Sequence, residues 1–226
     1  MKRKQSGFTL VEIAIVLVII GLLLGGILKG QELITNAKVR NLADQQNAVK
    51  AAFYAFQDRF RALPGDYRDA ATNIPNVAAG GNGNAQIEAG GTSGENVLVW
   101  YHLTNAGFIS CSQCAANPGA SPTPSQANSP INAFNGVMTI IFDKDYAGVA
   151  SDTNNLKSGG QIPSNIIAEV DRKIDDGVPT TGAFRFSAAN IGGGTAPDIA
   201  KCLTGATPQA WQLQTPESNC GGANML

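Results

Sequence analysis

The chain has 226 residues, which is near the upper range of a single domain. Its 16 basic and 17 acidic side chains nearly balance and form no basic tract, which argues against nucleic acid as a dedicated partner. The 26 glycines and 11 prolines predict many turns and long loops.

The chain begins with a short basic segment and a long apolar run. Residues 1–7 are basic, and residues 8–28 contain a single ionisable side chain, that of Glu12. As a helix, the run would span roughly 31 Å, enough to cross a bilayer core. A carboxylate buried there costs about 2.5–3.5 kcal/mol, so Glu12 needs a partner. The basic segment is expected to stay in the cytoplasm and to send the rest of the chain across the membrane.

Two ordinary explanations of the apolar run are less satisfactory. A secretory signal peptide is cut after its apolar run, but this run is too long for a typical signal core and continues into a charged helical pattern. A plain signal anchor fits the length and leaves the carboxylate of Glu12 unexplained.

The junction between the basic segment and the apolar run resembles that of type IV prepilins and of the related pseudopilins of type II secretion. Those precursors have a basic leader that ends in Gly, then Phe-Thr-Leu-Val-Glu and an apolar helix. The sequence matches at each position: Gly7, Phe8, Thr9, Leu10, Val11 and Glu12. The resemblance implies that a prepilin peptidase cuts between Gly7 and Phe8 and methylates the new amino group of Phe8.

The resemblance also implies a partner for Glu12, namely the Phe8 amine of an adjacent subunit in a filament. Elementary electrostatics agrees, because a buried ammonium and a buried carboxylate offset each other's desolvation only as a pair.

The helix is expected to continue through residues 29–63 with one apolar face. Pro64 would end it, because proline donates no backbone hydrogen bond and restricts the preceding residue. A single helix from Phe8 to Ala62 would be roughly 80 Å long. The apolar residues recur near the helical period at Leu42, Val49, Phe53, Phe56, Phe60 and Leu63.

Glycines in the first half of this helix allow two interpretations. They indicate close helix packing in the membrane or, by the resemblance, a segment that loosens when the helix enters a filament. These glycines are Gly21, Gly25, Gly26 and Gly30.

Short elements and loops follow the long helix. A helix at residues 67–72 would be capped by Asp66, residues 74–95 read as a loop, and residues 95–108 predict another helix. His102 is the single histidine. It is expected to be packed or solvated rather than a metal ligand, because no second ligand lies at a suitable spacing.

The four cysteines are expected to be paired, because the body of the chain would face an oxidising compartment. Cys111 and Cys114 favour a local structural disulfide over a zinc or redox site, since a second Cys-x-x-Cys is absent. The resemblance to type IV pilins favours Cys202–Cys220, although four cysteines allow three pairings and the sequence does not choose among them.

Residues 116–130 are rich in proline and predict an exposed loop. Its hydroxyl side chains could accept O-linked glycans: Ser121, Thr123, Ser125 and Ser129.

Three strands and one helix are predicted in the C-terminal part. The strands lie at residues 137–142, 183–187 and 210–213. The helix covers residues 165–175, with Ser164 as its cap.

Two groups of carboxylates invite a chemical interpretation. Asp143, Asp145 and Asp152 could hold calcium, but the full calcium-loop spacing is missing and a polar turn is favoured. Asp175 and Asp176 are adjacent but lack a partner base, nucleophile or metal set, so acid–base catalysis is not predicted.

The sequence predicts an α+β, pilin-like fold. A long N-terminal helix, apolar and then amphipathic, would pack on a small antiparallel sheet with extra short helices and long loops. The predicted divisions are a leader (residues 1–7), a transmembrane and filament-core helix (8–28), an amphipathic helix (29–63) and a globular head (64–226).

The resemblance implies a structural function. The chain would be a subunit of a type IV pilus-like filament in adhesion, motility or DNA uptake, or alternatively a pseudopilin of a periplasmic type II secretion filament. Its partners would be copies of itself, other pilins, prepilin peptidase and an inner-membrane assembly platform. It would first span the inner membrane once, with a cytoplasmic N-terminus and a periplasmic head, and then enter the filament.

A membrane-anchored enzyme is the remaining hypothesis. The sequence shows no Ser/His/Asp, Cys/His or metal-ligand constellation, so no catalytic residue, metal or cofactor is predicted.

Overall fold

The structure, a computed structural model, describes residues 9–90, 94–120, 122–148 and 151–226. The chain divides into two compact units, Met1–Lys38 and Val39–Leu226, which we call the first and second units.

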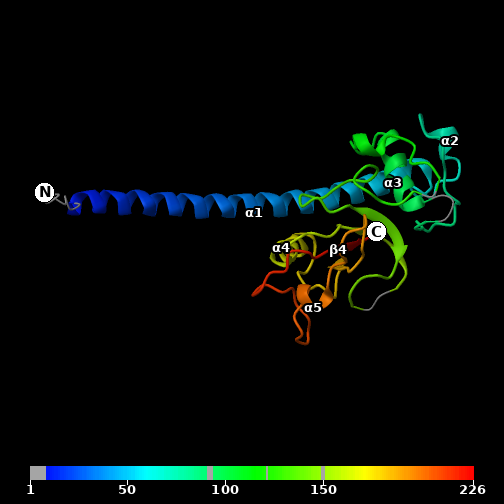
Figure 1. Ribbon diagram of the computed structural model, residues 1–226. Helices are drawn as coiled ribbons and strands as arrows, with labels where there is room; N and C mark the ends of the chain where they lie inside the picture. Colours follow the sequence, from blue (N-terminus) through cyan, green and yellow to red (C-terminus); the bar gives the residue numbers. More distant parts are fainter. Residues whose placement is uncertain (1–8, 91–93, 121, 149–150) are drawn as a thin grey trace. The chain divides into compact units, whose positions relative to one another are not determined.

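One long helix, α1 (Leu10–Phe60), supplies the first unit and enters the second (Figure 1). Its 51 residues correspond to about 77 Å of helix, which confirms the predicted long apolar N-terminal helix. The helix ends before the expected position, because Arg61 takes a left-handed conformation with φ of 55°. An αL residue at this point is a usual helix C-terminus, so Pro64 does not set the boundary.

The second unit contains a four-stranded antiparallel sheet in the order β1-β2-β4-β3. One row of side chains crosses it, because Ile140 pairs with Leu156, Leu156 with Asn224 and Asn224 with Phe184. All four side chains are buried. The strands are β1 (Thr139–Asp143), β2 (Thr153–Lys157), β3 (Phe184–Phe186) and β4 (Gly222–Met225).

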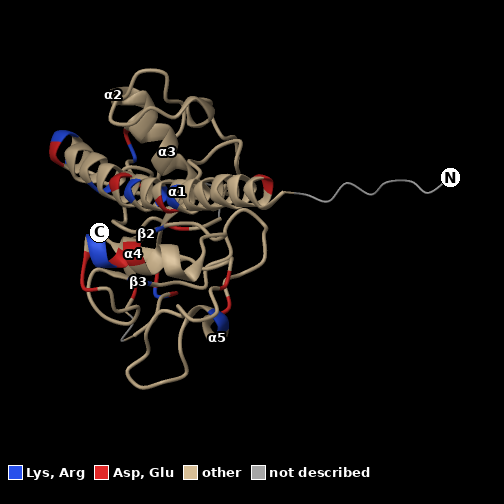
Figure 2. Ribbon diagram, turned by 90° about the vertical axis from the view of Figure 1, so that its left-hand side faces the viewer, with Lys and Arg blue, Asp and Glu red and all other residues tan. Residues whose placement is uncertain are grey.

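Short helices complete the second unit, as an α+β fold of this kind requires. Acidic and basic residues are interspersed along its ribbon (Figure 2). The helices are α2 (Ala70–Asn73), α3 (Glu95–Asn105), the 3-10 turn η1 (Ser112–Cys114), α4 (Ser164–Ile174) and α5 (Ile199–Cys202).

Two hydrophobic clusters share α1. In one, Phe56 packs with the fully buried Trp100 of α3 and with Ile140 and Leu156 of the sheet. In the other, Leu42 packs with α4, β3 and the C-terminal disulfide. Residues 39–56 of α1 therefore form the common wall of the second unit, and α3 runs beside this part of the helix (Figure 1).

Two local predictions are wrong. Residues 210–213 form only an isolated bridge between Trp211 and Leu203, because Trp211 donates its indole N–H to Asp171 and this segment follows side-chain anchors. Ser164 does not cap α4, whose N-cap is Pro163. The Ser164 hydroxyl instead donates to the Gln212 carbonyl at 2.6 Å.

Both disulfides are local in sequence. The structure joins Cys111 to Cys114 and Cys202 to Cys220, and all four side chains are buried. The second pair is the one that the resemblance favours.

Replacing Cys202 and Cys220 together by Ala is expected to lower the free energy of unfolding by about 3 kcal/mol, because the bond closes a loop with a separation of 18 residues. Replacing Cys111 and Cys114 should cost about half as much, because that separation is 3 residues. Urea unfolding of the full chain in detergent, without reductant, would measure both. Equal costs for the two pairs would contradict the loop-length argument.

Candidate functional site

The start of α1 has a reciprocal hydrogen-bond pattern between Thr9 and Glu12. The Thr9 backbone N–H and the Thr9 hydroxyl each donate to Oε2 of Glu12 at 2.8 Å. The Glu12 backbone N–H donates to Oγ1 of Thr9 at 3.2 Å. This pattern is a capping box, in which a helix N-terminus satisfies its own free N–H groups. The single chain therefore gives the Glu12 carboxylate partners of its own.

Thr9 is absent from the predicted site, although its Thr-x-x-Glu spacing is the sequence signal of a capping box. Gly7 and Phe8 lie outside the described residues, so cleavage and methylation there stay predictions. The role of Glu12 in assembly is also a prediction.

The surface around Glu12 is apolar and exposed. From Thr9 to Leu28 no other side chain is ionisable. By length and composition, α1 is the one helix in the described ranges that could cross a membrane. No neighbouring segment lies within 4 Å of a β-carbon built on its glycines, Gly21, Gly25, Gly26 and Gly30. Large exposed side chains on this stretch include Leu10, Ile13, Leu17, Ile20, Leu24 and Ile27. An apolar surface of this size calls for lipid or protein to cover it.

Asp66 has a different role from the predicted helix cap. Its carboxylate accepts hydrogen bonds from the backbone N–H groups of Gly83 at 2.6 Å, Asn84 at 3.0 Å and Ala85 at 2.7 Å. The N-cap of α2 is Asp69. Asp66 therefore fixes a loop, and the capping prediction is wrong.

His102 is packed in the core and bonded on both ring nitrogens. Nδ1 accepts from the Gly65 backbone N–H at 3.0 Å, and Nε2 lies 2.9 Å from the Ala79 carbonyl oxygen. Nε2 therefore carries the proton. Burial lowers the pKa of His102 from 6.5 to about 4, so the ring is neutral at pH 7.

The pKa of His102 predicts an acid-sensitive second unit. Because the unfolded chain binds this proton below about pH 6.5 and the folded chain only below about pH 4, stability should rise with pH across this window. The full contribution is about 3 kcal/mol. Urea unfolding at several pH values would show a smaller rise in His102→Gln than in the unsubstituted chain. An unchanged pH slope in this variant would contradict the prediction.

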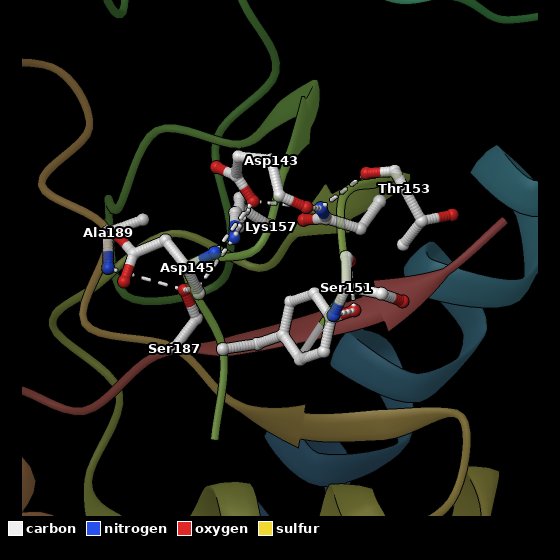
Figure 3. Close-up of polar contacts among 9 residues, drawn as sticks. Asp143, Asp145, Ser151, Thr153, Lys157, Ser187 and Ala189 are labelled. Carbon is white, nitrogen blue, oxygen red and sulfur yellow. Dashed lines mark hydrogen bonds and ion pairs between the residues drawn. The ribbon is translucent and has the colours of Figure 1, made fainter. Parts of the chain in front are cut away.

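Asp143 and Asp145 face a lysine ammonium. Nζ of Lys157 donates to Oδ1 of Asp143 and to the backbone carbonyl of Asp145, both at 2.8 Å (Figure 3). Burial lowers the pKa of Lys157, and the hydrogen bond and charge of Asp143 oppose that shift. Across the described ranges, no group of three or more His, Cys, Asp or Glu side chains is placed to hold a metal. The polar turn is thus built around Lys157.

Asp175 and Asp176 organise the turn that leads into β3. The Asp175 carboxylate accepts from the backbone N–H groups of Ala183 and Phe184. The Asp176 carboxylate accepts from the Thr181 hydroxyl at 2.6 Å, which is the main reason that its pKa is lowered. The observed contacts of both carboxylates are therefore structural.

Asp171 is a buried carboxylate with one satisfied oxygen. Its Oδ2 accepts from the Trp211 indole N–H at 2.7 Å, while Oδ1 has no hydrogen-bond partner within the described residues. Burial raises the pKa of Asp171 from 3.8 to about 6, opposed by the Trp211 hydrogen bond and reinforced by nearby Asp176 and Asp175.

Asp171→Asn is expected to stabilise the chain at pH 7. The folded chain retains this proton up to about pH 6 and the unfolded chain only to about pH 3.8, so stability should fall as pH rises between them, by up to about 3 kcal/mol. Asparagine keeps an oxygen for Trp211 and removes the charge. Chemical denaturation at pH 3.5 and pH 7 should therefore show a gain at pH 7 alone, and a loss at pH 7 would refute this assignment.

Comparison with protein families matches residues 2–28 to the prokaryotic N-terminal methylation motif. This segment includes Gly7, Phe8, Thr9 and Glu12, the residues at the junction described above. Neither the curated proteins nor the solved structures contain a significant match to the chain.

Proposed function

We propose that this chain, whose residues 2–28 match the prepilin-type methylation motif, is a structural subunit that assembles into a filament through α1. The observation that carries the proposal is the isolated carboxylate of Glu12 at the start of an exposed apolar helix. Proteins with this motif are structural subunits processed by prepilin peptidase.

Assembly would replace one set of Glu12 partners by another. In the single chain, Thr9 satisfies Oε2 of Glu12. After cleavage between Gly7 and Phe8, the methylated ammonium of Phe8 in an adjacent subunit would take over the carboxylate. A charged pair that leaves water together avoids the cost of an isolated buried charge. The pair would thereby fix the axial position of each subunit, since a misplaced subunit buries Glu12 without a counter-charge.

Lateral contacts between apolar helices would hold the filament. Before assembly, the same helix surface would be covered by lipid, because α1 is long and apolar enough to span a bilayer. The chain would therefore wait in the inner membrane, with the second unit on the periplasmic side, until an inner-membrane assembly platform transfers it into the filament.

The final location separates a type IV pilus from a type II secretion pseudopilus. We propose a surface filament and test it by shearing cells with and without the gene. Imaging and mass spectrometry of the sheared fraction should find filaments that contain this chain. Filaments confined to the periplasm would support the pseudopilin alternative, and a chain that stays monomeric in the membrane would contradict both.

A further inference from the structure

The second unit contains a polar cavity that neither assembly nor processing requires. Its volume is about 630 Å³, within the range of small-molecule sites. It lies over the sheet face that carries Thr139, Ile141 and Asp143 on β1 and Lys157 on β2. Residues 189–193 form another wall. Figure 3 shows how Lys157, Asp143, Asp145 and Ala189 converge at this position.

Two buried side chains in this cavity have unused hydrogen-bonding capacity. Asn96 is 3% exposed, and its Oδ1 accepts no hydrogen bond from the described residues. Lys157 is 1% exposed and donates to two oxygens, although an ammonium has three N–H groups. Buried polar groups are normally satisfied, so an acceptor and a donor left over beside one cavity point to a ligand.

The charge of the lining decides the chemical class of that ligand. Asp143 and Asp145 outnumber Lys157, so the cavity carries net negative charge and disfavours phosphate, sulfate and carboxylate groups. Hydroxyl and amide groups of Thr123, Ser125 and other residues add neutral hydrogen-bonding sites. Apolar walls from Ile141, Ile191 and Pro124 suit C–H groups.

We propose that this cavity binds a neutral sugar residue. One hydroxyl of the sugar donates to Oδ1 of Asn96, and another accepts from Nζ of Lys157. A hydroxyl group can do both, which matches the leftover acceptor and donor. The proposal stands whether or not the chain enters a filament.

A second cavity extends the binding surface. It has a volume of about 510 Å³ and shares Ala189, Asn190 and Ile191 with the first. Its remaining polar lining includes Gln161, Thr195, Glu217 and Asn219. An oligosaccharide should therefore bind more tightly than a single sugar.

The test uses the full chain in a detergent without a sugar head group. Calorimetric titration with maltotriose, cellotriose, chitotriose and mannotriose is expected to give at least one dissociation constant of about 1 mM or lower. The corresponding monosaccharide should bind more weakly, and sialyllactose, an anionic trisaccharide, at least about tenfold more weakly. Absence of binding by all four neutral sugars at about 10 mM, or tighter binding of sialyllactose, would overturn the proposal.

Asn96→Leu provides the sharpest variant, because leucine has a similar shape and removes a buried unsatisfied amide without threatening the fold. Binding should weaken at least about tenfold, the usual effect of losing a buried hydrogen bond. Gln46→Leu is the matched control, since Gln46 is also buried with an unsatisfied amide but does not line the cavity. Unchanged binding by folded Asn96→Leu, or equal loss in both variants, would overturn the assignment of the site.

Discussion

Glu12→Gln is expected to abolish filament assembly while leaving membrane insertion and removal of residues 1–7 intact. Glutamine keeps the shape and the hydrogen-bonding oxygen but cannot neutralise the Phe8 ammonium of an adjacent subunit. Removing one member of a buried ion pair costs about 3–5 kcal/mol, which is a factor of more than about 100 in an association constant. The sheared filament fraction, quantified against the membrane fraction, would measure the loss.

Two variants separate the charge of Glu12 from other effects at this helix. Glu32→Gln is the matched control, because Glu32 lies on the same helix in an exposed ion pair with Lys29 at 2.7 Å and should change little. Thr9→Val removes the capping hydroxyl, worth about 1 kcal/mol, and should reduce the filament yield far less than Glu12→Gln. Filament yield that is unaffected by Glu12→Gln would refute the proposed pair.

Gly7→Leu is expected to block processing completely. The matched motif places Gly7 just before the cut, and a large side chain would obstruct the peptidase. The variant should remain in the membrane with residues 1–7 attached and should yield no filaments. Intact-mass measurement of the membrane-extracted chain would show this directly.

Ser6→Ala is the control for the Gly7 variant, because it changes the neighbouring leader residue to another small one. It should be processed normally. Loss of residues 1–7 from Gly7→Leu would show that the cut has been assigned to the wrong bond.

The sequence was sufficient for the long helix and for the motif at its start. Both depend on strong local signals: an apolar run with one carboxylate and the six-residue junction from Gly7 to Glu12. The helix α4 was also readable, because Ile166, Ile167 and Val170 recur at helical spacing and are buried in the structure.

Two strands of the sheet were not predicted because their sequences lack a strand signal. Strand β2 contains two asparagines, and β4 begins with glycine and has no β-branched residue. Their pairing depends on contacts between segments far apart in the chain, such as Leu156 opposite Asn224. Tertiary contacts of this kind override local propensity.

Polar roles that depend on the folded chain were equally hidden. Asp66 reads as a helix cap but binds the loop at residues 83–85. Lys157 looks like an ordinary charged residue, yet it is buried against Asp143. The Thr9–Glu12 box, in contrast, was readable from its spacing, because both partners lie within one helical turn.

The N-terminal residue of the mature protein tests the central claim most directly. Mass spectrometry of the chain isolated from its native cells should find N-methylated Phe8 as the first residue. A mature chain that begins with Met1, or at a residue beyond Leu28, would contradict the proposed filament subunit.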